Sequence, residues 1–236
     1  MKRARQLLGS AAIALALGFN IPYAVLASLY DYPAILRRPA AEALDRFAAL
    51  GSSVILAWHG FALAALALVP LAIALAITPA RLRTSPAVAI GAAMSGALAG
   101  LAQAIGLWRW VFVVPALARS HADPATPFAM RQADETAFAL LNAYGGVAIG
   151  EHIGQLLTAL FVGLVATLQW REDARRTAWL GFATALIMAL GAHEGLALAL
   201  GADGSLFSAF TIAAFAGLTA WLIATGAGLI KGRTAP

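Results

Sequence analysis

The chain has 236 residues, a formal net charge of +5 and no cysteine, and 61% of its residues are hydrophobic while only 11% are charged. Roughly a quarter of the residues in an ordinary soluble domain are charged, so this composition, with a mean hydropathy of +0.82, excludes that class. The lack of cysteine excludes disulfides, thiolate metal ligands and cysteine nucleophiles.

The charged residues are confined to short stretches between six long apolar runs. Runs of about 20 apolar residues match the hydrocarbon core of a bilayer, which is roughly 30 Å thick. The runs show no alternation of period two, so they predict helices and not the strands of a barrel. The sequence predicts one all-α, polytopic membrane domain over residues 1–236, a six-helix bundle with spans at about 7–29, 53–77, 87–115, 137–168, 178–200 and 205–230.

The first run follows basic residues at positions 2, 3 and 5, a pattern shared by signal peptides and first membrane helices. We favour a retained helix, because the run is long for a signal peptide and no small-x-small cleavage site precedes Tyr30. In the next polar segment, apolar residues from Leu36 to Ala48 recur at helical spacing opposite the charges. This pattern predicts a short amphipathic helix lying along the outer interface, and a second short helix is expected near 127–133.

Basic residues report the orientation of a membrane protein, because loops rich in Lys and Arg stay in the cytoplasm. If the N-terminus is cytoplasmic, the cytoplasmic segments contain Lys2, Arg3, Arg5, Arg81, Arg83, Arg171, Arg175, Arg176, Lys231 and Arg233. The longer outer segments contain the other six of the 16 basic residues, with seven of the 11 acidic ones. Both termini are therefore predicted to be cytoplasmic. The basic residues are dispersed at helix ends, so we expect the lipid bilayer as a partner and no nucleic acid.

Glycines at a spacing of four predict close packing of the third, fourth and fifth helices, because backbone contact drives helix association in lipid. They are Gly96 and Gly100, then Gly146, Gly150 and Gly154, then Gly191 and Gly195.

Two apolar runs contain a His–Glu pair flanked by glycines: Glu151–His152 in the fourth run and His193–Glu194 in the fifth. These runs cross the membrane in opposite directions, so the reversed order places both histidines about 10–12 Å below the outer interface at roughly 1.5 Å per residue. Ionisable groups are costly in a bilayer and call for an explanation. We expect a polar layer in the outer half of the membrane formed by Asn20, His59, Arg109, Glu151, His152, Gln155, His193 and Glu194.

Three interpretations of this layer remain open. It can be a structural network of Glu and His side chains that pair across the helices. Arg109 is then the counter-ion of Glu151 or Glu194, a contact for an anion, or an interfacial side chain between two tryptophans. It can be a site for a small ligand, a lipid or a proton, with Glu151 and Glu194 as titrating groups. The least favoured is a metal or haem site, since no single helix has H-x-x-x-H or H-x-x-E spacing; its ligands would come from His59, His152, His193, Glu151 and Glu194.

Three segments resemble a known bacterial membrane family. They are the segment 30–39 with Arg46 and Phe47, the segment 108–115 (WRWVFVVP), and the segment 150–154 (GEHIG). The chain is similar in these segments, and over most of its length, to the family catalogued as domain of unknown function 4386. The resemblance implies a six-helix protein of the bacterial inner membrane, and it implies no reaction, substrate or cofactor.

The sequence thus predicts a multi-pass protein of the bacterial inner membrane with a polar His/Glu pocket that binds or senses a small molecule, ion or lipid. The alternative is a membrane-embedded enzyme, either a metal-dependent hydrolase or an isomerase that uses Glu and His as acid and base. A third is a transporter subunit, which would require oligomers because the chain has no clear internal repeat. The oligomeric state is left open.

Overall fold

A computed structural model describes residues 2–232 of the chain, and every regular element within them is helical. Six continuous helical stretches are long and apolar enough to cross a membrane, which confirms the predicted six-helix membrane fold. The elements are α1 (Lys2–Tyr30), η1 (Ala34–Arg37), α2 (Ala40–Leu50), α3 (Ser52–Ala76), α4 (Pro79–Thr84), α5 (Pro86–Phe112), α6 (Val114–Ala122), α7 (Phe128–Leu141), η2 (Asn142–Ile153), α8 (Gly154–Arg171), α9 (Arg175–Gly191), α10 (Glu194–Ala199) and α11 (Ser205–Ile230).

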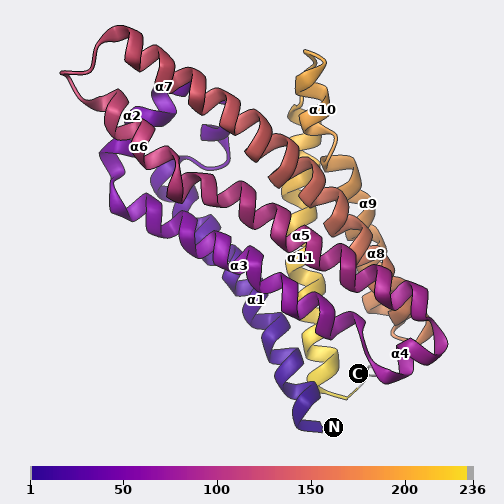
Figure 1. The fold of residues 1–236 in the computed structure, drawn as a ribbon. Helices are drawn as coiled ribbons and strands as arrows, with labels where there is room; N and C mark the ends of the chain where they lie inside the picture. Colours follow the sequence, from indigo (N-terminus) through magenta and orange to yellow (C-terminus); the bar gives the residue numbers. More distant parts are fainter. Residues whose placement is uncertain (1, 233–236) are drawn as a thin grey trace.

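The long helices form a closed ring in which the first and the last are neighbours. Helix α1 packs on α3, α3 on α5, α5 on α8, α8 on α9, α9 on α11, and α11 returns to α1. Both ends of the described chain lie at one end of the bundle, near α4, which we call the terminal end (Figure 1). The short elements α2, α6, α7 and α10 lie toward the opposite end.

Three predicted spans differ from the observed helices at the end opposite the termini. The fifth, predicted at 178–200, divides after Gly191 into α9 and α10. The third apolar run divides at Val113 into α5 and α6. The fourth begins early, because the short helix expected near 127–133 is the start of α7, which continues through η2 into α8. The segment η2 is a π-helix of 12 residues, a form that is usually found as a single turn and frequently lies at functional sites.

Helix α2 occupies the segment predicted to be amphipathic, but its apolar face does not lie free along the interface. Ala43, Leu44 and Phe47 on that face are buried, because α2 packs on α6 and α7. His121 at the end of α6 adds a polar link, with Nδ1 2.8 Å from Asp45 on α2 and Nε2 3.1 Å from Glu135 on α7. The apolar face of α2 is therefore buried against other helices, and not in lipid as the sequence predicted.

Glycines allow the helices to approach closely, as their spacing predicted. A Cβ built on Gly106 of α5 would lie 2.7 Å from the Cα of Gly150 in η2, and one built on Gly154 would lie 2.9 Å from Gln103. A similar contact joins the first and last helices, where a Cβ on Gly9 would lie 2.5 Å from the carbonyl oxygen of Gly226. These positions bring the helix backbones into contact.

Replacing Gly106 with alanine is expected to destabilise the bundle, because the added methyl group meets backbone atoms that cannot rotate away. Overpacking costs about 1–3 kcal/mol, and the better helix propensity of alanine returns up to ~1 kcal/mol. Gly163→Ala on α8 is the matched control, since its Cβ would lie 3.6 Å from Ala185, an ordinary contact. Thermal unfolding in detergent, followed by circular dichroism, should show a lower Tm for Gly106→Ala and an equal or higher Tm for Gly163→Ala. Equal values for the two variants would contradict this packing.

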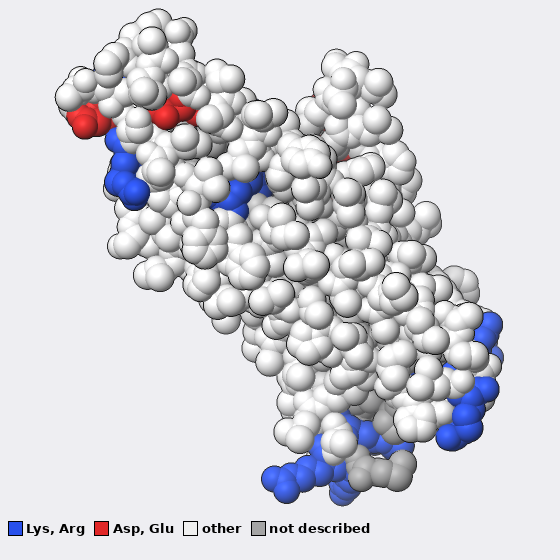
Figure 2. Space-filling model, in the orientation of Figure 1, with Lys and Arg blue, Asp and Glu red and all other residues white. Residues whose placement is uncertain are grey.

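Lys and Arg gather at the terminal end of the molecule (Figure 2), as the charge distribution predicted for one side of the membrane; Arg233 lies outside the described residues.

One of these basic side chains is buried. Arg81 of α4 is 6% exposed and binds the Glu172 carboxylate through two nitrogens, at 2.6 and 2.7 Å. The same guanidinium donates to the carbonyl oxygen of Leu75 at the end of α3. This ion pair joins the α3–α5 connection to the α8–α9 connection.

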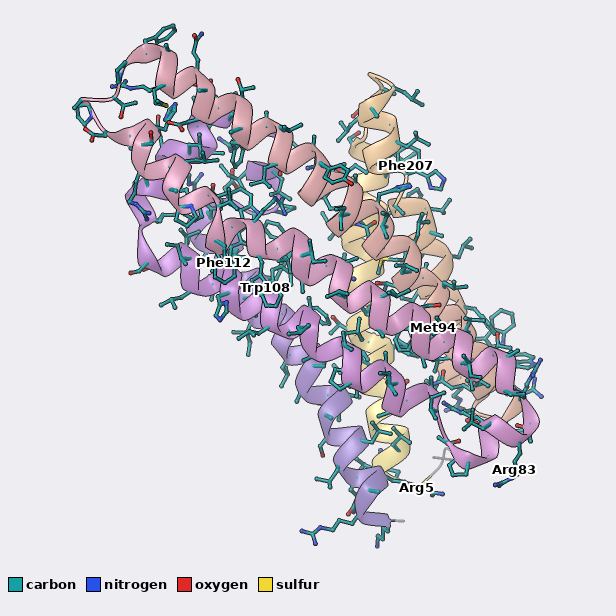
Figure 3. The ribbon with its side chains drawn as sticks, viewed as in Figure 1. Arg5, Arg83, Met94, Trp108, Phe112 and Phe207 are labelled. Carbon is teal, nitrogen blue, oxygen red and sulfur yellow. The ribbon has the colours of Figure 1, made fainter. Side chains whose placement is uncertain are left out.

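The outward faces of the long helices are apolar, as contact with lipid requires. On α5, Met94 is 60% exposed and Phe112 is 71% exposed, and both are labelled in Figure 3. Arg5 and Arg83 lie at the terminal end in the same view.

Candidate functional site

A cavity of about 460 Å³ lies within the ring of helices, away from the terminal end. Its walls come from α1, α3, α5, η2, α8 and α11, and η1 and α10 contribute at its margin. Most of the wall is apolar and aromatic, formed by Phe19, Tyr23, Tyr32, Trp58, Phe61, Leu107, Trp110, Ile212, Phe215 and Leu218. The polar part is small, so the cavity has an apolar body with a few polar groups.

The cavity has a side that faces the exterior of the bundle between α1 and α11. Asn20 on α1 and Ala216 on α11 line the cavity and are also exposed, and Ile212 is 50% exposed. Figure 1 shows the reason: the two helices lie together near the terminal end and separate toward the other end. This opening lies along membrane-spanning segments.

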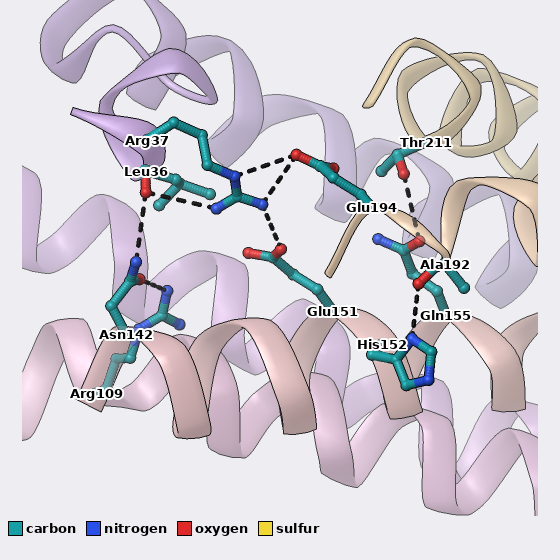
Figure 4. Close-up of polar contacts among 10 residues, drawn as sticks. All are labelled: Leu36, Arg37, Arg109, Asn142, Glu151, His152, Gln155, Ala192, Glu194 and Thr211. Atoms are coloured by element: carbon teal, nitrogen blue, oxygen red, sulfur yellow. Dashed lines mark hydrogen bonds and ion pairs between the residues drawn. The ribbon is translucent and has the colours of Figure 1, made fainter. Parts of the chain in front are cut away.

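Arg37 joins the two intramembrane acids at the margin of the cavity (Figure 4). Its Nη2 lies 2.7 Å from Glu151 of η2 and 3.0 Å from Glu194 of α10, and its Nε donates to Glu194 at 3.1 Å. Burial alone would lower the pKa of Arg37, but the two carboxylates outweigh burial and raise it above its usual value. Arg37 therefore remains charged, and it holds three segments that are distant in sequence.

Arg109 is buried in the wall of the cavity and does not pair with either acid. Its Nη1 donates to the Gly106 carbonyl oxygen and its Nη2 donates to Asn142 at 2.9 Å. The amide of Asn142 in turn donates to the Leu36 carbonyl oxygen at 3.3 Å. A Cβ on Gly146 would lie 2.5 Å from Nη2 of Arg109, so only glycine leaves room for the guanidinium here. The expectation that Arg109 is the counter-ion of Glu151 or Glu194 is wrong, because Arg37 takes that role.

The polar side chains deeper in the cavity are paired with hydroxyl groups. Asn20 donates to Thr219 at 2.9 Å and to the Ala16 carbonyl oxygen at 2.7 Å. Gln103 donates to Thr158 at 2.8 Å, and Thr211 donates to Gln155 at 3.3 Å. Apart from the Asn20–Ala16 bond within α1, these bonds cross between helices, and together they satisfy amides that would otherwise be unpaired in an apolar wall.

None of the three intramembrane histidines predicted for the site lines the cavity. His152 contacts the Ala192 carbonyl oxygen at 2.7 Å. His193 contacts the Ala189 carbonyl oxygen at 2.9 Å and lies beside Phe207. His59 is on α3, also outside the lining. The two Glu residues meet at Arg37, whereas each neighbouring histidine contacts a backbone carbonyl oxygen of the α9 end or of the turn that follows it.

Within residues 2–232, no group of three or more His, Asp or Glu side chains is placed to hold a metal ion. The five residues named above as candidate ligands are thus not gathered around one point. Glu151 and Glu194 share Arg37, while the histidines contact backbone carbonyl oxygens or lie elsewhere.

The site includes residues that sequence reasoning did not select. Tyr32 precedes the short helix η1 and Arg37 ends it, and neither belongs to a long periodic run; Trp58 and Trp110 look like ordinary core residues. Tyr32 is partly buried beside the rings of Tyr23 and Trp58, and desolvation raises the pKa of its phenol, which stays neutral. The sequence does contain an indication of Arg37. Two acids within membrane spans need a basic partner, and the adjacent outer segment is rich in arginine.

A family model described as "Domain of unknown function (DUF4386)" matches residues 7–226. No curated protein and no solved structure matches the chain.

Proposed function

The chain belongs to the DUF4386 family, and from this premise we propose that it is a membrane receptor or carrier that binds an amphipathic small molecule or lipid in the cavity. The observation that carries the proposal is one enclosed space with aromatic and aliphatic walls, a polar margin and a side open between α1 and α11. A volume of about 460 Å³ lies in the range of roughly 300–1,000 Å³ typical of ligand sites.

The position of the opening favours a ligand that enters from the bilayer. Such a ligand needs an apolar body to partition into lipid, and the walls offer Phe19, Ile212 and Phe215 to that body. It also needs a polar group, and the margin formed by Arg37, Glu151 and Glu194 provides charge at one end. The positive-inside pattern supports cytoplasmic termini in a bacterial inner membrane, with the cavity in the outer half.

A bulky side chain in the cavity tests this proposal. Ser208 lines the cavity from α11, and Ala209 beside it is exposed and does not line it. In nanodiscs of phosphatidylcholine, we expect isothermal titration calorimetry to detect binding of at least one ten-carbon amphiphile from a panel of decanol, decanoate, decyl phosphate and decyltrimethylammonium. Ser208→Phe should weaken this binding about tenfold or more, the effect of losing roughly 1.4 kcal/mol of contact.

Ala209→Phe is the matched control and should bind like the unmodified protein. The proposal fails if no member of the panel binds above empty nanodiscs. It also fails if Ser208→Phe binds as well as Ala209→Phe.

A further inference from the structure

Resting on the proposed function, we infer that the ligand carries an anionic oxygen head group, a carboxylate or a phosphate, which Arg109 binds together with the indole N–H groups of Trp58 and Trp110. These three side chains line the same cavity. They come from α3 and α5, on the wall away from the opening between α1 and α11.

The first argument is the charge on Arg109. Its side chain is only 7% exposed, and among residues 2–232 it makes no ion pair. Its two bonded nitrogens donate to neutral oxygen atoms, those of Gly106 and Asn142. Glu151 acts on Arg109 through space, but its carboxylate contacts Arg37 at 2.7 Å, so among the described residues no acidic oxygen contacts the Arg109 guanidinium. A buried cation that no anion contacts is costly, and an anion in the cavity would make that contact.

The second argument is a set of unused donors. Within the part of the chain that the structure describes, Nε of Arg109 and the indole nitrogens of Trp58 and Trp110 are buried without a hydrogen-bond partner. Buried tryptophan N–H groups usually have a partner, and all three of these groups can only donate. No other lining side chain has a buried polar atom without a partner. These three donors therefore lack acceptors, which a carboxylate or phosphate in the cavity would provide.

The third argument is that these donors belong to one rigid group. The rings of Trp58 and Trp110 are stacked, with centroids 4.9 Å apart and planes 6° apart. The Cζ atom of Arg109 lies 5.1 Å from the centroid of the Trp110 ring. Trp58 is 1% exposed and Trp110 is 0% exposed, so packing fixes both indoles. Preorganised donors discriminate strongly against ligands that have no hydrogen-bond acceptor, because such a ligand leaves the donors unpaired.

A matched pair of ligands tests the head group. Decanoate and decanol share a chain length and differ in the carboxylate. We expect decanoate and decyl phosphate to bind the protein in phosphatidylcholine nanodiscs at least tenfold more tightly than decanol, and decyltrimethylammonium to bind most weakly. Calorimetry on Arg109→Gln should show this preference reduced to about twofold or less. Arg119→Gln is the control, because Arg119 is exposed on α6 and outside the lining.

Substitutions of the two tryptophans test the head-group inference even if Arg109→Gln does not fold. Trp58→Phe and Trp110→Phe retain an aromatic ring and lose the N–H group. Each should reduce the preference for decanoate over decanol by about tenfold, the lower end of the range expected for one hydrogen bond to a charged group. Size-exclusion profiles identify folded variants. A preference that survives in every folded variant overturns the inference.

The outcomes separate this inference from the function it rests on. If decanol binds as tightly as decanoate, the cavity is an amphiphile site and the anionic head group is wrong. If no amphiphile binds, both fail. Adding phosphatidylglycerol to the nanodiscs distinguishes the source of the anion: weaker decanoate binding assigns the site to a phospholipid phosphate, and unchanged binding assigns it to a free amphiphile.

Discussion

Replacing Glu172 with glutamine is expected to lower the free energy of unfolding more than any of the other substitutions proposed for this protein. Glu172 is the partner of Arg81, whose side chain is only 7% exposed, and Glu172 itself is 16% exposed. The amide of glutamine would turn a donor toward the guanidinium and leave its charge unpaired. Breaking a buried ion pair by removing one partner costs about 3–5 kcal/mol, and partial exposure favours the lower end of that range.

The neighbouring acid provides a matched control for Glu172. Asp173 is 87% exposed and pairs only with Arg175, which is also exposed, at 3.2 Å. Exposed pairs contribute at most about 1 kcal/mol, so Asp173→Asn should leave the unfolding midpoint almost unchanged. The free energy of unfolding can be measured in mixed micelles with sodium dodecyl sulfate. Similar losses for Glu172→Gln and Asp173→Asn would show that the Arg81 pair does not secure the two connections.

Replacing Arg37 with glutamine is expected to produce the second-largest loss and to alter the cavity as well. Two carboxylates, with side chains 24% and 12% exposed, would lose their shared cation. An unpaired buried acceptor costs about 1–3 kcal/mol; taking the lower half of that range for each acid gives a total of ~2–4 kcal/mol. The segment η1 would also lose its attachment to η2 and α10, so we expect amphiphile binding to weaken together with stability.

Arg38 is the matched control for Arg37, because it is adjacent, is itself exposed, and binds Asp31 and Glu42 near the surface. Arg38→Gln should change the free energy of unfolding by less than about 1 kcal/mol and leave binding intact. A loss of similar size in Arg37→Gln and Arg38→Gln would show that Arg37 does not hold the two acids.

The fold could be predicted from the sequence largely because lipid imposes a simple requirement on each span. The apolar runs gave six helices, and the reversed order of the two His–Glu pairs placed Glu151 and Glu194 at one level, where both now contact Arg37. The spacing of Gly150 and Gly154 identified a face that packs against α5. These signals repeat with the period of a helix, so a single sequence is enough to detect them.

The features of the site that could not be predicted depend on local interruptions of the helices and on the connections between them. The turn at Ala192 and His193 directs Glu194 to the cavity margin and His193 toward Ala189, and an apolar run shows no sign of that turn. The π-helix η2 changes which faces Glu151 and His152 present compared with an α-helix. Arg37 is placed by the four-residue helix η1 within the connection between α1 and α2, and so short an element has no repeat to detect.

The contact between α1 and α11 has a consequence for biosynthesis. Gly9 and Asn20 lie on α1, and their partners Gly226 and Thr219 lie on α11, which is synthesised much later. Domains generally begin to fold while synthesis proceeds from the N-terminus, so α1 stands in the membrane with an amide exposed to lipid until α11 is inserted. A chain that stops before residue 205 lacks one wall of the cavity. The cavity is thus completed only by the insertion of α11.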